Sequence, residues 1–309
     1  MKPRFSVITV CLNSGEKLRE TVESALGQDF SDFEIIVKDG GSTDGSVEAI
    51  EHRYAPAGRS SDRPGQEREG DAAAPSGQAN AADAVNSSVQ AHAGDARVRI
   101  VRRQDTGIYD AMNQAVSEAR GEYLIFMNCG DYFADEKVLG ALNAAIREDG
   151  SSGPLRIYYG DRYARLTGSV EYSAPKITPL VCYRNIPCHQ AICYSASCFE
   201  RRGYDPKYKV RADYEHFLWC YFAGKAAFCH VPVTIASYEG GGYSETKQNA
   251  ERSAREHAEI TRRYMSPFQR FYCRAYLILT LQPLRHAIAT NPRLSGFYNA
   301  MVRRLYRKH

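Results

Sequence analysis

The chain has 309 residues, 43% of them hydrophobic, and a net charge of +4, as expected of a globular protein with one large domain and an appendage, or with two domains. Nine cysteines without a repeating spacing argue against a disulfide scaffold and favour a reducing cytoplasm. No stretch approaches the ~20 apolar residues of a membrane-spanning helix, and no secretory cleavage pattern follows the apolar run at residues 5–12.

The first half of the chain alternates predicted strands and helices. Short apolar runs predict strands at residues 5–10, 33–38, 97–101 and 123–127. Apolar residues at helical spacing predict helices at 18–26, around Val47 and Ile50, and at 108–119. This alternation predicts an α/β fold with a parallel or mixed sheet covered by helices on both faces.

One segment interrupts the alternation. Residues 55–96 are rich in Ala, Gly, Ser, Asp and Arg, contain no aromatic residue, and have only Val85 and Val89 as large apolar residues. Such a segment buries too little surface to offset the entropy lost on ordering. We therefore expect a disordered surface insertion that carries no chemistry.

The strand at 123–127 ends abruptly in Asn128 and Asp131. The carboxyl ends of strands are where open α/β sheets bind ligands. A strand-end carboxylate beside a glycine suits a hard divalent cation that shares its coordination with a diphosphate. The alternative is that Asp131 only caps the following turn.

Eight motifs together resemble the family 2 glycosyltransferases, in particular bacterial enzymes of exopolysaccharide, O-antigen and colanic-acid biosynthesis. They are residues 7–13 (VITVCLN), 36–45 (IVKDGGSTDG), 105–113 (DTGIYDAMN), 127–131 (MNCGD), 159–161 (YGD), 188–191 (CHQA), 212–215 (ADYE) and 241–244 (GGYS). The resemblance implies a GT-A fold, a Rossmann-like mixed sheet with helices on both faces, over residues 1–245.

The resemblance also implies roles for single residues. Thr9 and Asn13 match the end of the first strand, which lies along the nucleotide, and Asp39 matches the carboxylate that binds the base or ribose. Asp131, with Asn128 beside it, matches the motif that holds Mg²⁺ or Mn²⁺. An amide replaces the first carboxylate of that motif here.

Further candidates follow from the same motifs. Asp213 matches the catalytic base of the inverting enzymes, and the alternative is that it only caps a helix. Asp105, Asp110 and Asn113 are expected to face the donor, because their loop precedes the metal-binding strand.

The acceptor or phosphate side is expected to include His189, Gln190, Glu215 and Gly242. His189 and Gln190 could instead be a structural polar pair. Glu215 is the second candidate for the base. Gly242 belongs to a loop that either closes over the diphosphate or links to the tail. The cysteines near His189 lack the spacing of a zinc site.

These features predict an inverting, metal-dependent glycosyltransferase that uses a nucleotide-diphosphate sugar and a saccharide or lipid-linked saccharide acceptor. The alternatives are a nucleotidyltransferase that makes the sugar nucleotide, for which the glycine-rich basic phosphate loop is missing, and a non-catalytic nucleotide-sugar binder, against which Asp131 and Asp213 argue.

Residues 246–309 form a predicted basic, amphipathic helical tail. No acidic residue follows Glu259, whereas residues 260–309 carry ten Lys and Arg beside aromatic and aliphatic stripes. Residues 266–309 are therefore expected to bind an anionic membrane and to place the enzyme at the inner face of the plasma membrane. The alternative is that these helices pack on the catalytic domain or on a partner. Nucleic acid is not expected, because no recognition motif accompanies the charge.

Overall fold

A computed structural model of the chain describes residues 2–54, 95–151, 153–240 and 246–280, with residues 288 and 291. The strands are β1 (Phe5–Cys11), β2 (Phe33–Asp39), β3 (Val98–Arg102), β4 (Tyr123–Phe126), β5 (Tyr132–Phe133), β6 (Arg156–Ala164), β7 (Ser169–Glu171), β8 (Ile192–Ser195) and β9 (Ala227–Tyr238). The helices are α1 (Glu16–Leu26), α2 (Ser46–Tyr54), α3 (Ile108–Glu118), α4 (Val138–Glu148), α5 (Pro179–Arg184), α6 (Ser197–Arg201), α7 (Ala212–Phe222), α8 (Lys247–Tyr264) and α9 (Pro267–Leu279), with a 3₁₀ turn, η1 (His189–Ala191). Gly242, nearly all of the predicted insertion and most of the tail beyond residue 280 lie outside the described residues.

The strands of the described residues form one mixed sheet in the order β3-β2-β1-β4-β8-β6-β9-β5, with β7 paired to β6. Strands β3, β2, β1 and β4 are parallel, and β8 runs antiparallel to β4 and β6. Every residue of β1, β2 and β4 is buried, as is typical of parallel strands covered on both faces. The predicted α/β fold with a mixed sheet is confirmed.

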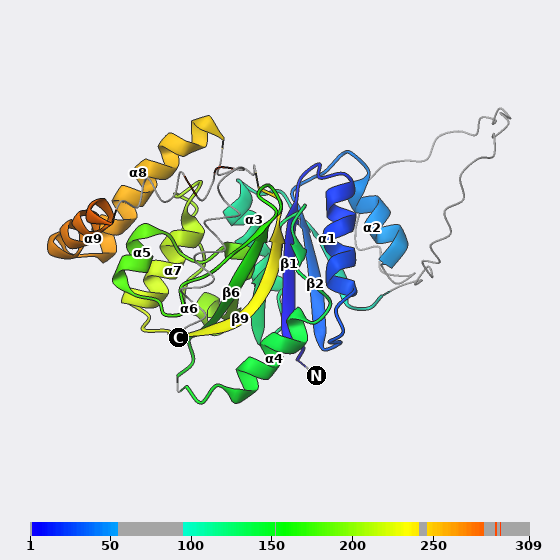
Figure 1. Ribbon diagram of the computed structural model, residues 1–309. Coiled ribbons are helices and arrows are strands. Elements are labelled where there is room, and N and C mark those ends of the chain that lie inside the picture. The colour runs from blue at the N-terminus through cyan, green and yellow to red at the C-terminus, as the bar shows by residue number, and fades with distance from the viewer. Residues whose placement is uncertain are drawn as a thin grey trace, which may run out of the picture.

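Two hydrophobic cores lie on opposite faces of this sheet. Successive strand residues point to opposite faces, so Val7 joins the core beneath α1, α2 and α4, whereas Ile8 joins the core beneath α3 and α7. Figure 1 shows α1 and α2 at one side of the sheet and α8 and α9 at the far side. Because β1, β2 and β4 are parallel, the loops that follow them lie at one edge of the sheet.

Helix α8, which the sequence analysis assigns to the tail, packs against the domain that precedes it. Ile260 is fully buried in the core beneath α7. The Arg211 guanidinium donates to the Ser253 carbonyl at 3.0 Å, and His257 Nε2 lies 2.8 Å from the Tyr183 carbonyl. Helix α8 therefore braces the segment that leads into α7.

Candidate functional site

The loops that follow β1 and β2 are joined by hydrogen bonds of Asn13. Its N–H donates to Ser42 Oγ at 2.9 Å, and its Oδ1 accepts from the Thr43 N–H at 2.8 Å. Thr9, within β1, is buried, and its hydroxyl has no partner among the described residues. Asn13 thus fixes the shape of the predicted nucleotide loop, while direct contact of Asn13 or Thr9 with a nucleotide stays a prediction.

Asp39 is the last residue of β2, one residue beyond the strand end expected from the sequence. Its Oδ1 accepts from the N–H groups of Gly41 and Ser42 at 3.1 and 2.8 Å and from the Ser42 hydroxyl at 2.7 Å. The side chain is buried. Oδ2 accepts no hydrogen bond from the described residues, which leaves it available to a nucleoside.

Asp105 is held by Lys38, a residue that sequence reasoning missed. The Lys38 side chain is fully buried, and its Nζ lies 2.9 Å from Asp105 Oδ2. The same Nζ donates to the carbonyls of Asp39 and Arg103 at 2.9 and 2.6 Å. This buried cation ties the loop after β2 to the loop after β3. Asp105 therefore helps to hold the two loops together, and its contact with the donor stays a prediction.

Asp110 and Asn113 lie on α3. Asp110 Oδ2 accepts from the N–H and the hydroxyl of Thr106, at 2.8 and 3.0 Å, and so closes the turn before the helix. Asn113 donates to the Tyr204 carbonyl at 2.9 Å and accepts from the Tyr204 N–H at 2.8 Å. Because both polar groups of its amide are engaged, Asn113 tethers α3 to the loop before α7, and its contact with the donor stays a prediction.

Asp131 lies buried in the turn after β4. Its Oδ1 accepts from the Glu239 N–H at 2.9 Å, and its Oδ2 accepts from Gln190 Nε2 at 2.7 Å. Burial raises the pKa of Asp131 to about 6, although these two hydrogen bonds act in the opposite direction. Gln190, expected on the acceptor or phosphate side, therefore orients the predicted metal ligand.

The donor atoms in this turn fit a divalent cation that is shared with a ligand. Asn128 Oδ1 is buried and has no hydrogen-bond partner among the described residues, and Asp131 adds a carboxylate three positions later. Within the described residues, no group of three or more His, Cys, Asp or Glu could hold a metal. Mg²⁺ commonly takes one or two protein carboxylates and completes its shell with phosphate oxygens and water.

Three charged residues around this turn were missed by sequence reasoning. Lys17 Nζ lies 2.8 Å from Glu239 Oε2. That oxygen packs so close to Gly130 that a Cβ at this position would lie only 2.6 Å from it, and the positive φ of Gly130 also favours glycine here. Arg165 donates to the Gly130 carbonyl. Arg165 thus brings positive charge beside Asp131, whereas the charge of Lys17 is paired with Glu239. Sequence spacing gives no sign of either contact.

Asp213 is the second residue of α7, and it does not cap that helix. The helix begins after Arg211, whose side chain makes no capping hydrogen bond. Glu256 of α8 instead accepts from the N–H groups of Lys209, Val210 and Arg211, at 2.9, 3.0 and 2.9 Å. Asp213 Oδ1 accepts from the Tyr109 hydroxyl at 2.8 Å, and Oδ2 has no partner among the described residues.

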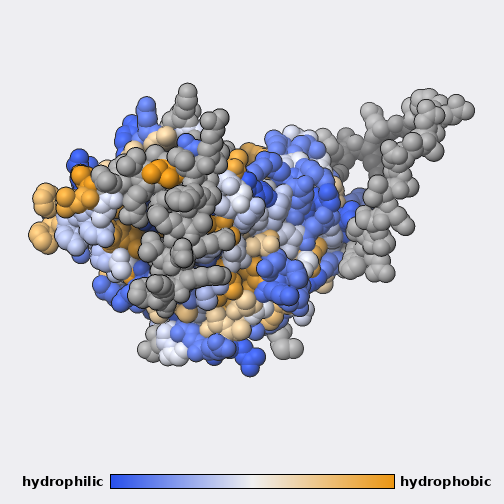
Figure 2. All heavy atoms as spheres, viewed as in Figure 1, coloured by the Kyte–Doolittle hydropathy of each residue, from blue (hydrophilic) through white to orange (hydrophobic). Residues whose placement is uncertain are grey.

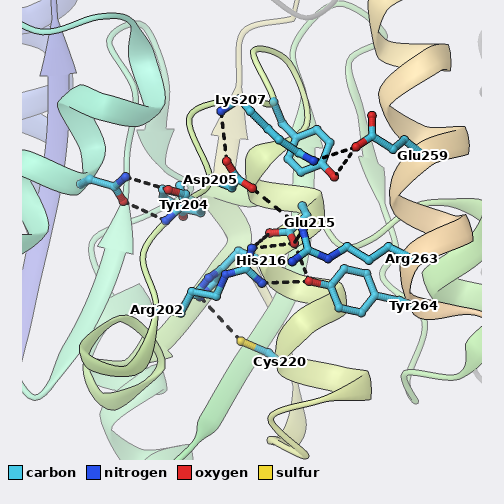
Figure 3. Close-up of polar contacts among 12 residues, drawn as sticks. Arg202, Tyr204, Asp205, Lys207, Glu215, His216, Cys220, Glu259, Arg263 and Tyr264 are labelled. Atoms are coloured by element: carbon cyan, nitrogen blue, oxygen red, sulfur yellow. Dashed lines mark hydrogen bonds and ion pairs between the residues drawn. The ribbon is translucent and has the colours of Figure 1, made fainter.

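Glu215, the second candidate for the base, is fully buried in a network of cations (Figure 3). Arg202 Nη2 donates to both of its oxygens, at 2.7 and 2.8 Å. Arg263 lies 3.4 Å away, and the Tyr264 hydroxyl also donates to it. These partners hold the buried carboxylate, so Glu215 joins α7 to α8 in the structure, and its place on the acceptor side stays a prediction.

His189 is buried between aromatic side chains. Its ring stacks on Phe126 with centroids 5.0 Å apart, and its Nε2 lies 2.8 Å from the Tyr204 hydroxyl. Burial lowers the pKa of His189, whereas the charge of Asp213 raises it. The predicted base is therefore close enough to act electrostatically on η1, the turn that also supplies Gln190 to Asp131.

The sequence comparisons agree on one family. The family model described as "Glycosyl transferase family 2" matches residues 6–74 and 77–209. A "PGL/p-HBAD biosynthesis glycosyltransferase" of Mycobacterium tuberculosis (strain ATCC 25177 / H37Ra) is 31% identical over 246 residues, which cover 79% of this chain and 80% of that protein.

The structural comparisons agree on the fold. Residues 1–349 of S. aureus TarS in complex with UDP-GlcNAc superpose with a TM-score of 0.55 at 17% identity, over 83% of this chain and 66% of that one. The mannosyltransferase PcManGT from Pyrobaculum calidifontis in complex with GDP-Man and Mn²⁺ gives a TM-score of 0.54 at 15% identity, over 100% of this chain and 89% of that one. A second structure of S. aureus TarS contains a longer chain, and this chain covers 43% of its length.

Proposed function

Because the chain belongs to glycosyl transferase family 2, we propose that it moves a sugar from a nucleotide-diphosphate donor to a hydroxyl of a saccharide acceptor. The observation that carries this proposal is a pair of carboxylates linked through η1. Asp131 is bonded to Gln190 of this turn, and His189 of the same turn is joined to Asp213 through the side chains of Tyr204 and Tyr109. One carboxylate is thus available to the leaving diphosphate and the other to the acceptor.

In this proposal Asp213 is the catalytic base. Its Oδ2 takes the proton of the acceptor hydroxyl as the hydroxyl oxygen attacks the anomeric carbon. The bond between that carbon and the diphosphate breaks with its electron pair on the diphosphate. A single in-line displacement inverts the anomeric configuration and needs no covalent intermediate.

The leaving diphosphate needs positive charge. A bound Mg²⁺ or Mn²⁺ would supply Lewis-acid stabilisation of the leaving phosphate oxygens, and Asp131 with Asn128 would hold it. Arg165 adds positive charge from the chain itself. The Mn²⁺ in the mannosyltransferase complex supports metal use in this fold.

The donor is identified with a panel of nucleotide sugars that includes UDP-GlcNAc and GDP-mannose, the sugar nucleotides bound to the two structural neighbours. Ligands that bind the folded state raise its melting temperature. The true donor should raise the melting temperature with Mn²⁺ present and less with EDTA, and should be consumed when a mixture of saccharide acceptors is added.

The same experiment separates the two alternatives. A nucleotidyltransferase would form a sugar nucleotide from a sugar phosphate and a nucleoside triphosphate. A non-catalytic binder would show the thermal shift without turnover of any donor. Release of a nucleoside diphosphate from the panel is expected of the glycosyltransferase alone.

We propose a lipid-linked acceptor in the biosynthesis of cell-surface polysaccharide or glycolipid. The mycobacterial relative is named for PGL/p-HBAD biosynthesis. No helix of the described residues is long and apolar enough to span a membrane. Helix α9 nevertheless carries six large apolar side chains that are 43–82% exposed: Phe268, Phe271, Tyr272, Tyr276, Ile278 and Leu279.

Helix α9 supports attachment to the cytoplasmic face of an anionic membrane. Figure 2 shows hydrophobic residues at the end of the molecule where α9 lies. Arg262, Arg270 and Arg274 stand close by in the sequence, and no acidic residue follows Glu259. Exposed aromatic and aliphatic side chains next to uncompensated positive charge suit the interface of an anionic bilayer.

A further inference from the structure

The hydroxyl of Tyr109 lies between two acceptors at the start of α7. It is 2.8 Å from Asp213 Oδ1 and 2.8 Å from the Val210 carbonyl. A phenol has one proton, so it donates to only one of them at a time. Burial and the nearby charge of Asp213 raise the pKa of Tyr109 well above its usual value, which keeps this group a neutral donor.

This hydroxyl is the one side-chain donor to Asp213 in the described part of the chain. No Lys, Arg or His of the described residues lies within ion-pair distance of that carboxylate. Its titratable neighbours are His189 of η1, Tyr194 of β8 and Tyr204 of the loop before α7.

None of these neighbours supplies positive charge at neutral pH. Burial lowers the pKa of His189 and raises those of Tyr194 and Tyr204, which keeps all three uncharged. Glu256 of α8 adds a negative charge near Tyr109. The hydrogen bond from Tyr109 is therefore the one side-chain contact that restrains the Asp213 carboxylate among the described residues.

At the start of α7, Glu256 holds the backbone and Tyr109 holds the side chain of Asp213. Glu256 fixes the backbone that enters α7 through three N–H groups, so Asp213 is released from helix capping. Tyr109 then restrains only the orientation of the carboxylate. With Oδ1 engaged, Oδ2 is the oxygen left for an incoming hydroxyl.

We propose that Tyr109 is a positioning residue that aims Oδ2 of Asp213 at the acceptor, an inference that rests on the proposed role of Asp213 as base. In the transfer step the acceptor O–H bond breaks, its proton passes to Oδ2, and the oxygen forms the new bond to the anomeric carbon. The bond to the diphosphate breaks at the same time. Once Asp213 is neutral, the Tyr109 proton can turn to the Val210 carbonyl, so the hydroxyl has an acceptor both before and after the step.

The test compares Tyr109→Phe with Tyr214→Phe. Each substitution removes one hydrogen-bonded hydroxyl and keeps the ring. The hydroxyl of Tyr214, also on α7, donates to the Cys182 carbonyl at 2.6 Å and does not bond to Asp213. Tyr214→Phe therefore reports the structural cost of losing a hydroxyl from this region.

The first readout needs no substrate. In protein labelled with ¹³C at the aspartate carboxyls, the Asp213 resonance is assigned by its absence in Asp213→Asn. Because Tyr109 donates a hydrogen bond to this carboxyl, Tyr109→Phe should move its chemical shift, and Tyr214→Phe should leave it in place. The same chemical shift in wild type and Tyr109→Phe would overturn the inference.

The second readout uses the donor identified by the panel. Tyr109→Phe should lower kcat about tenfold with little change in the donor KM, and Tyr214→Phe should keep a kcat close to wild type. Full activity of Asp213→Asn would instead refute the base itself, a result distinct from an unmoved Asp213 resonance in Tyr109→Phe.

Discussion

At the scale of single residues, the buried position of Asp131 makes its charged form costly for the stability of the fold, although the proposed metal site needs that charged form. Burial raises the pKa of Asp131 from 3.8 to about 6, so the folded protein binds this proton more tightly than the unfolded chain does. The carboxyl therefore contributes stability that is fully present below pH 3.8 and is lost as the pH rises through about 6. A bound cation would reverse this cost by favouring the charged form.

Replacement of Asp131 by Asn should therefore have opposite effects on stability and binding. Without metal, and with EDTA present, Asp131→Asn should melt at a higher temperature than wild type at pH 8, with a smaller difference at pH 5. The same variant should lose Mn²⁺-dependent binding of UDP and GDP in calorimetric titrations. Undiminished Mn²⁺-dependent affinity would remove Asp131 from the metal site.

At the scale of elements, the start of α7 depends on a carboxylate from α8. Glu256→Gln keeps the shape of the side chain but removes one acceptor and the negative charge beside three N–H groups. The loss should be about 1–3 kcal/mol, as for hydrogen bonds to a charged group. Urea unfolding of the variant measures it.

The matched control is Glu259→Gln on the same helix. Glu259 bonds to Lys207 at 2.8 Å with both side chains more than half exposed, and such surface pairs contribute about 0–1 kcal/mol. Equal losses for the two variants would show that the Glu256 contacts do not support α7.

The predicted insertion should be dispensable, because the described residues on its two sides meet. The Asp95 N–H donates to the Tyr54 carbonyl at 2.7 Å, so the chain leaves and returns at one point. Deletion of residues 57–94 should leave the melting temperature and the turnover of the donor close to wild type. A clear loss of either would show that the segment packs on the domain.

The sequence predicted those features that depend on local pattern. Short apolar runs predicted the strands of the sheet, and the polar residues that follow these runs predicted carboxylates at strand ends. Asp39 and Asp131 do lie at or just after such ends. Each of these patterns spans only a short stretch of sequence. The contacts of Glu256 with Val210 and of Lys17 with Glu239 join positions far apart in the chain, and no local pattern reports them. The contacts of Glu215 with Arg202 and Arg263 could not be predicted for the same reason, since these partners lie on other segments.

At the scale of the whole molecule, the exposed face of α9 should control membrane binding. Sedimentation with phosphatidylglycerol vesicles should be strong at low salt and weaker at high salt. The triple variant Phe268→Ser, Phe271→Ser and Leu279→Ser changes only exposed side chains, and it should stay in the supernatant.

The control for that experiment is Leu166→Ser, which removes an equally exposed apolar residue (71% exposed) from the β6–β7 connection. This variant should sediment like wild type. If the triple variant also sediments like wild type, α9 is not the membrane-binding surface.

The central claim is that Asp213 is the base of a glycosyl transfer. The most direct test is the turnover of the identified donor by Asp213→Asn, measured at saturating donor with Mn²⁺ and a saccharide acceptor. Asparagine keeps the shape of the side chain and cannot take the proton, so kcat should fall by about 10²-fold or more, with donor affinity close to wild type. A kcat within about twofold of wild type would show that Asp213 is not the base.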